Sequence, residues 1–182
     1  MIRAVIFALA TASTLVAAAQ TSPCKPPTAE DYYQQGKSAS EKKEYDAAIA
    51  AFEKAIRLDP KMAKAWHCRG ASHVSKDECD KAVSDFTEAI RLDPKMALAW
   101  YGRGTAYFVK HEYDKAVFDF TEAIRLDPKM ALAWYDRGTA YLVKHEYDKA
   151  IADLSESIRL DPNTCGRAIR PKRTRILHEP KN

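Results

Sequence analysis

The chain repeats itself every 34 residues, and this repetition constrains its fold more than any other feature of the sequence. The segment MALAWYGRGTAY, which starts at Met96, returns at Met130 as MALAWYDRGTAY with one letter changed. A period of this length indicates an array of small units that cannot bury their apolar faces alone and therefore stack on their neighbours. The tetrapeptide Arg-Leu-Asp-Pro marks the period and ends at Pro60, Pro94, Pro128 and Pro162.

Each unit contains two amphipathic helical segments. In the unit 97–130, LAWYGRGTAYFVK and YDKAVFDFTEAIRL both place apolar residues at steps of three and four, the spacing of one helix face. The polar residues 110–112 separate the segments, and Asp127 ends the second because the residue before a proline disfavours the helical conformation. The sequence therefore predicts four helical hairpins, at residues 29–62, 63–96, 97–130 and 131–164.

The small and aromatic positions of these units resemble the tetratricopeptide repeat (TPR) family, which has this period. The early aromatic residue of the first helix is Tyr32, Trp66, Trp100 and Trp134. The glycine where the two helices approach is Gly36, Gly70, Gly104 and Gly138, followed by Tyr107 and Tyr141 in the last two units. The second helix supplies Ala48, Ala82, Ala116 and Ala150, then Phe52, Phe86, Phe120 and Leu154, then Ala55, Ala89, Ala123 and Ser157.

The resemblance implies an all-α fold, an α-solenoid of four helix-turn-helix hairpins stacked as a right-handed superhelix. In this family the first helices line a concave groove. The residue types agree with such packing, because glycine and alanine permit close helix approach while tryptophan and phenylalanine fill the space between hairpins.

The chain departs from the family where a leucine usually precedes the glycine. Gln35, Arg69, Arg103 and Arg137 stand there instead. An arginine at this seam must lay its stem along apolar side chains and carry its guanidinium to water or to a carboxylate. We interpret the row as a packing variant, with a functional basic row as the alternative.

The first nineteen residues have the pattern of a secretory signal peptide. Arg3 precedes an apolar or small-residue run, and Ala17-Ala18-Ala19 offers a small-x-small cleavage site before Gln20. An uncleaved anchor is the alternative, but the run is short for a span of ~20 residues. We therefore expect a signal peptide at 1–19, a flexible segment at 20–28, and an exported protein, periplasmic or secreted.

The last residues, 165–182, form a basic tail that the formal net charge of +4 partly hides. Gly166, Pro171 and Pro180 interrupt it and no helical apolar face is present, which predicts a disordered tail. The alternative is an adaptor that binds anionic lipid or an envelope polymer through this charge, so that a membrane surface is a second candidate partner. Nucleic acid is not expected as a partner of an exported protein. The basic residues are Arg167, Arg170, Lys172, Arg173, Arg175 and Lys181.

The four cysteines give no metal-binding pattern. Cys68 and Cys79 fall on opposite arms of one predicted hairpin at different levels, beyond the ~7 Å Cα separation that a disulfide allows. Cys24 and Cys165 lie in the two ends, where their pairing stays open; a lipidated Cys24 is disfavoured because Pro23 precedes it. No Cys-x-x-Cys or Cys/His spacing of the zinc type occurs, so we expect no metal and no cofactor.

Catalysis has no support in the sequence. His67, His73, His111 and His145 each stand at a repeat position, and neither a nucleophile set nor a glycine-rich phosphate loop is present. We therefore expect an interaction module that is not an enzyme and that binds a protein or peptide partner.

The resemblance places the ligand residues on the concave side of the first helices. The basic and asparagine set with which some family members clamp a C-terminal carboxylate is absent, since Lys37 and Lys64 alone do not rebuild it. A row of aromatic rings remains, suited to an extended peptide or a helix. The alternative is that Leu98 and Leu132 only pack helix against helix. The predicted groove residues are Tyr33, Gln34, Lys37, Lys64, His67, Cys68, Leu98, Tyr101, Gly102, Thr105, Phe108, Leu132, Tyr135, Asp136, Thr139 and Leu142.

Two further features concern specificity and assembly. The positions held by Gln34, Cys68, Gly102 and Asp136 differ in every unit while their surroundings stay fixed, so specificity is first sought there. In the last unit Ser155 and Ser157 replace threonine and alanine, which indicates partial capping of the array. An apolar strip with Leu154 and Ile158 remains, which favours self-association or docking of the tail.

Overall fold

The computed structural model describes residues 26–164. Within this range the chain forms eight α-helices and no strand, so the predicted all-α solenoid of helical hairpins is confirmed. The signal segment, Cys24, Cys165 and the basic tail lie outside the described residues. The first helices of the hairpins are α1 (Ala29–Glu41), α3 (Ala63–Ser75), α5 (Ala97–Val109) and α7 (Ala131–Val143). The second helices are α2 (Tyr45–Leu58), α4 (Cys79–Leu92), α6 (Tyr113–Leu126) and α8 (Tyr147–Leu160).

The helix ends and turns are fixed by local contacts, most of which recur along the array. α1 begins at a capping box, in which Thr28 and Asp31 each satisfy a backbone N–H of the other. Within the hairpins, one residue of each link adopts a positive φ and reverses the chain; His111, with φ 61°, does so in the third. Between hairpins, the Trp100 indole N–H donates to the Pro94 carbonyl at 3.0 Å, which fixes the aspartate-proline turn against the next helix.

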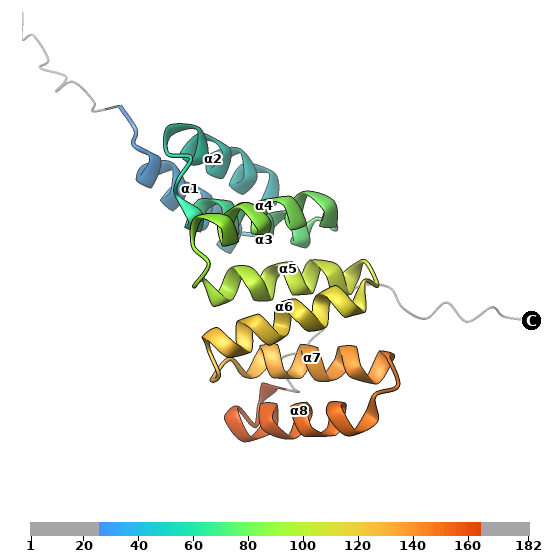
Figure 1. The fold of residues 1–182 in the computed structure, drawn as a ribbon. Coiled ribbons are helices and arrows are strands. Elements are labelled where there is room, and N and C mark those ends of the chain that lie inside the picture. Colours follow the sequence, from blue (N-terminus) through green and yellow to red (C-terminus); the bar gives the residue numbers. More distant parts are fainter. Residues whose placement is uncertain (1–25, 165–182) are drawn as a thin grey trace, which may run out of the picture.

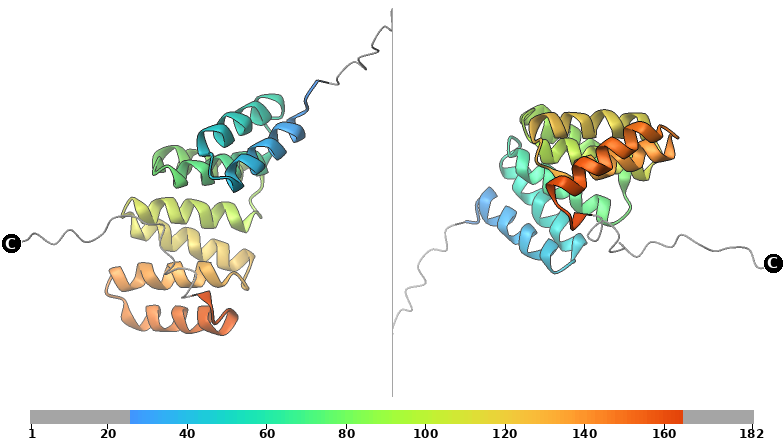
Figure 2. Two further views of the ribbon diagram at one scale, coloured as in Figure 1. Left: turned by 180° about the vertical axis from the view of Figure 1, so that it is seen from behind. Right: turned by 90° about the horizontal axis from the view of Figure 1, so that it is seen from below.

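The hairpins stack in chain order, with α1 and α8 at opposite ends, and each is turned relative to its neighbour (Figures 1 and 2). Each second helix packs on the first helix of the following hairpin. Successive first helices also touch one another, whereas in the described chain no two second helices are in contact. The first helices are therefore crowded on the inner side of the curve, where the sequence predicts the groove.

Phenylalanine and glycine fix the spacing inside each of the first three hairpins, and Leu154 takes the place of phenylalanine in the fourth. Phe120 is fully buried, and a Cβ atom on Gly104 would lie 2.8 Å from its ring. The helices can approach this closely only because Gly104 has no side chain. Between hairpins the seam is made of alanine and isoleucine: Ala123 and Ile124 of α6 pack on Ala133 of α7.

Each predicted arginine of the first helix reaches a buried carboxylate. Arg103 donates two hydrogen bonds to Asp119, from Nε at 2.8 Å and from Nη2 at 2.9 Å, and its guanidinium lies over the Trp100 ring. Asp119 is only 1% exposed, and burial raises its pKa while the bond to Arg103 opposes that rise. The packing interpretation of the arginine row is therefore confirmed. The same pairs join Arg69 to Asp85 and Arg137 to Asp153.

The structure also bears on the cysteines and on membrane spans within the described residues. Cys68 and Cys79 are free thiols. This agrees with the expectation that they lie too far apart on the two helices of their hairpin to form a disulfide. No helix within residues 26–164 has the length and hydropathy needed to cross a bilayer.

The packing predicts different costs for the same substitution at two phenylalanines of α6. Phe120→Ala should lower the free energy of unfolding by about 3–5 kcal/mol, because it leaves a cavity between α5 and α6. Phe118→Ala should cost less than about 1 kcal/mol, because the Phe118 side chain is 60% exposed. Urea unfolding monitored by circular dichroism measures both, and equal losses would contradict the packing described for Phe120.

Candidate functional site

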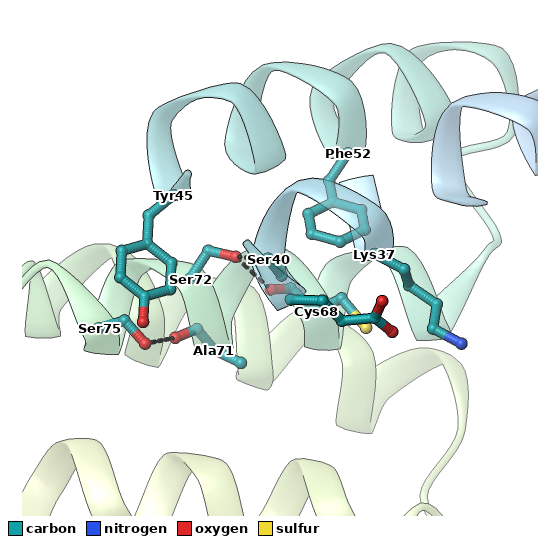
Figure 3. Close-up of a pocket in the computed structure, with 9 residues that line it drawn as sticks. Lys37, Ser40, Tyr45, Phe52, Cys68, Ala71, Ser72 and Ser75 are labelled. Carbon is teal, nitrogen blue, oxygen red and sulfur yellow. Dashed lines mark hydrogen bonds between the residues drawn. The ribbon is translucent and has the colours of Figure 1, made fainter. Parts of the chain in front are cut away.

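The inner face carries two adjoining hollows. The first, about 370 Å³ in volume, lies between α1 and α3 and is closed from behind by Phe52 of α2 (Figure 3). Lys37 extends at its edge, and Ser40 hydrogen bonds to Ser72 at 3.4 Å across the two helices. Its lining residues are Lys37, Ser40, Glu41, Tyr45, Phe52, Cys68, Ala71, Ser72 and Ser75.

The second hollow, about 280 Å³ in volume, lies between α3 and α5. It shares Ala71 and Ser75 with the first, so the two form one path across α3. Each has room for one or two side chains of a ligand. The lining residues of the second hollow are His67, Ala71, Val74, Ser75, Phe86, Leu98, Tyr101, Gly102 and Thr105.

The centre of this path is uncharged at neutral pH. Burial lowers the pKa of His67, which keeps its imidazole neutral, and burial raises the pKa of the Cys68 thiol. Burial also raises the pKa of Tyr101, helped by the nearby Asp136 carboxylate. Charged groups lie at the borders of the path: Lys37 and Glu41 line the first hollow, Lys64 pairs with Glu30 at 2.6 Å, and Asp136 accepts the hydrogen bond of Tyr101.

At two of the four positions that vary between units, Cys68 and Asp136, the side chain bonds to a neighbouring hairpin. The Tyr101 hydroxyl donates to Asp136 of the next hairpin at 2.7 Å, and the Cys68 thiol donates to the Tyr33 hydroxyl at 3.8 Å. Gly102 makes no such bond; a Cβ atom there would lie 2.5 Å from the Phe86 ring of the preceding hairpin. Cys68, Gly102 and Asp136 therefore take part in packing between hairpins, and the Tyr101 hydroxyl is used within the protein.

None of the predicted groove residues is buried, but not all of them line the two hollows. Phe108 packs edge-on against Tyr113 with ring centroids 5.4 Å apart, outside both hollows. Leu98 is 54% exposed, and Leu132 and Leu142 are both 41% exposed. The predicted residues that line neither hollow are Tyr33, Gln34, Lys64, Phe108, Leu132, Tyr135, Asp136, Thr139 and Leu142.

The sequence reasoning missed the small residues of α3. Ala71 and Ser75 line both hollows, and Val74 lines the second. The repeat period could have identified Ala71, because it stands where α5 and α7 have the predicted groove residues Thr105 and Thr139.

A histidine between carboxylates lies elsewhere, at the link between α3 and α4. His73 is 7% exposed, its Nδ1 lies 2.7 Å from Glu78, and its Nε2 lies 3.8 Å from Asp85. Ser84 lines the same depression, but its hydroxyl donates to the Asp80 carbonyl and is not directed at His73. In the described residues no group of His, Cys, Asp and Glu side chains could hold a metal ion.

The profile described as "Tetratricopeptide repeat" matches residues 97–130 and 131–164, and the profile described as "TPR repeat" matches residues 29–77. The chain belongs to the tetratricopeptide repeat family. TPR proteins are in general non-catalytic scaffolds for protein–protein interaction. No curated protein sequence matches the chain.

Several solved structures share the fold. The crystal structure of MamA is similar with a TM-score of 0.71 and 25% sequence identity, over 78% of this chain and 83% of that one. The thermophilic TPR protein TTC0263 of Thermus thermophilus has a TM-score of 0.67 at 20% identity, over 74% and 75% of the two chains. The first TPR of Spaghetti (RPAP3), bound to the HSP90 peptide SRMEEVD, has a TM-score of 0.64 at 21% identity, over 65% and 94%.

Equivalent positions of the groove should respond differently to replacement by alanine. Gly102→Ala should lower the free energy of unfolding by about 1–3 kcal/mol, because its Cβ displaces the buried Phe86 ring. Cys68→Ala, at the same position one hairpin earlier, keeps a Cβ that the structure already accommodates and should cost less than about 1 kcal/mol. Chemical denaturation measures both, and a neutral Gly102→Ala would contradict the close approach of Phe86.

Proposed function

We propose that this TPR chain is an exported, non-catalytic scaffold that binds a peptide or a helix of a protein partner in its concave groove. The observation that carries the proposal is the path across α3, which is uncharged at its centre and has the exposed Leu98 in the lining of its second hollow. Exposed apolar side chains next to a hollow are typical of a protein-binding surface.

The residues that line the path indicate which side chains of a partner it can bind. His67, Leu98 and Tyr101 surround the second hollow with rings and methyl groups, which suits an apolar side chain of the ligand. The first hollow is more polar and has Lys37 at its edge, which suits a hydroxyl or an acidic group one or two residues along. The ligand therefore combines one apolar anchor with a polar neighbour.

A free C-terminal carboxylate is not the anchor in this proposal. The RPAP3 domain, bound to a peptide, supports only the capacity of such a fold to hold one. Here Lys64 is engaged by Glu30, which leaves Lys37 as the single cation beside the first hollow. Affinity would come from apolar contact and shape on helices already stacked, at little ordering cost.

Replacing exposed leucines of the groove should weaken binding without unfolding the chain. Twelve-residue peptides displayed on phage are selected on the full chain, and their affinity is measured by fluorescence anisotropy. Leu98→Ala combined with Leu132→Ala should raise the dissociation constant about tenfold or more, the loss expected for removing hot-spot contacts. Leu58→Ala is the control, because Leu58 is 56% exposed on α2, outside both hollows.

Two results would count against the groove. One is equal affinity for the double variant and the parent chain. The other is loss of binding on deletion of residues 166–182 with the groove variants unaffected, which would instead support the adaptor that acts through its basic tail.

Export is part of the proposal and predicts a processed N-terminus. Cleavage after Ala19 should leave Gln20 as the first residue of the protein recovered from outside the cytoplasm. Intact-mass spectrometry measures this directly. Replacing Ala17 and Ala19 with leucine should abolish processing, because signal peptidase accepts small residues there. Recovery of the parent chain with Met1 in place would refute cleaved export.

A further inference from the structure

The last helix exposes the face that the other second helices bury. α2, α4 and α6 each pack between the first helix of their own hairpin and that of the next, whereas α8 lies at the end of the stack and contacts only α7 among the eight described helices (Figure 1). Ile124 of α6 is 7% exposed, but Ile158 at the same position of α8 is 48% exposed. Ile151 is 63% exposed and Tyr147 is 56% exposed.

These side chains form one continuous stripe. Tyr147, Ile151, Leu154 and Ile158 are separated by four, three and four residues, the spacing of the apolar seam of a coiled coil. The stripe runs almost the whole length of α8. It is therefore shaped to receive another helix along its axis.

An acidic group beside the stripe also lacks the partner that its equivalents have. In the array, Asp80 pairs with Lys110 at 2.7 Å and Asp114 pairs with Lys144 at 2.6 Å, each reaching the next hairpin. Asp148 has the same place on α8, and among residues 26–164 no basic group pairs with it. An occupant of this face should bring a cation to Asp148.

The chain's own continuation does not fit as a fifth first helix. Aligned on the period, Arg167 would stand at the position of Ala133, which is fully buried in the seam, and Lys172 at that of Gly138, where the helices approach. Pro171 would remove a backbone donor within the helix. Residues 165–182 therefore cannot repeat the packing that α3, α5 and α7 provide.

Stacking onto the other end of a second molecule is also unfavourable. On α1, Asp31 occupies the position of Ala133, so that a head-to-tail contact would bury a carboxylate in an apolar seam. Such a contact would also propagate into a filament, whereas two identical faces form a closed dimer.

We propose that α8 is a dimerisation surface that takes the α8 of a second copy of this chain, antiparallel about a two-fold axis. This register places Tyr147 opposite Ile158 of the second copy, and Ile151 opposite Leu154 of the second copy. It also places Asp148 on the same side as Arg159 of the second copy and about one turn or less away along the axis. The Arg159 side chain is 69% exposed, and within residues 26–164 it is bonded only to Glu156 of its own helix, at 2.6 Å, so it can supply the missing cation.

The first test is the mass of the full chain in solution, by sedimentation velocity over a wide range of concentration. The chain should change reversibly from one copy to two. Ile151→Glu should raise the dimer dissociation constant about tenfold or more, because it places a carboxylate in the centre of the seam. Leu58→Glu, an equally exposed apolar-to-acid change on α2, should leave that constant unchanged.

The second test fixes the register. Asp148→Arg alone and Arg159→Asp alone should each weaken the dimer several-fold, and the combined variant should recover most of the loss, because the swap restores opposite charges across the two-fold axis. Circular dichroism checks that all variants keep the helix content of the parent.

The proposal is overturned by a single-copy mass at every concentration, which would leave the face to a foreign helix or to none. It is overturned by equal weakening with Leu58→Glu, or by a combined charge swap that recovers nothing. A dimer that appears only after deletion of residues 165–182 would overturn it for the full chain, by showing that the tail occupies the face there. None of these measurements involves a groove ligand, so their failure leaves the proposed peptide binding untouched.

Discussion

A buried arginine–aspartate pair joins the two helices of each of the last three hairpins. Asp119 would be an uncompensated charge without the two bonds from Arg103, and removing one partner of such a pair costs about 3–5 kcal/mol. The same guanidinium stacks on Trp100 and donates to Thr87 of the preceding hairpin at 3.2 Å. The Arg103 side chain thus joins the two helices of its own hairpin to each other and to the preceding hairpin. The spacing of the first helices on the inner face depends on these contacts.

The spacing explains why the inner face has hollows where it does. Each buried phenylalanine of a second helix (Phe52, Phe86 and Phe120) needs a glycine opposite it in its own hairpin, and Phe86 also meets Gly102 of the next. With no side chain at Gly102 and a small one at Ala71, α3 and α5 leave space between them that His67 and Tyr101 border. In the last two hairpins Asp136 accepts a hydrogen bond from Tyr101, so the same position joins the helices instead.

The sequence was sufficient for the fold but only for part of the site. The period, the glycines where the two helices approach and the need of Arg103 for water or a carboxylate follow from residue type and helical spacing, which are local properties. The place of Phe120 inside its own hairpin, against Gly104, does not, because phenylalanine was expected between hairpins. The contact of Gly102 with Phe86 does not, because it depends on the angle between hairpins. The use of the Tyr101 hydroxyl by Asp136 was missed for the same reason, since side chains that share a face were taken to point at a ligand and not at each other.

The two ends of the array differ in kind, and this difference bears on how the molecule assembles. At α1, Asp31 both caps its own helix and puts a charge where other first helices have a buried alanine, so that end resists stacking. At α8, the serines at 155 and 157 reduce apolar area, yet the isoleucine at 158 keeps the exposed seam that Ile124 buries in α6. Because Ser157 donates to the Ala131 carbonyl, it serves the internal packing of α7 and α8 and does not make the outer face polar. The charge of Asp31 therefore disfavours stacking at the first helix, whereas the last helix presents an exposed apolar stripe. Two copies can associate through this stripe, but a filament is not favoured.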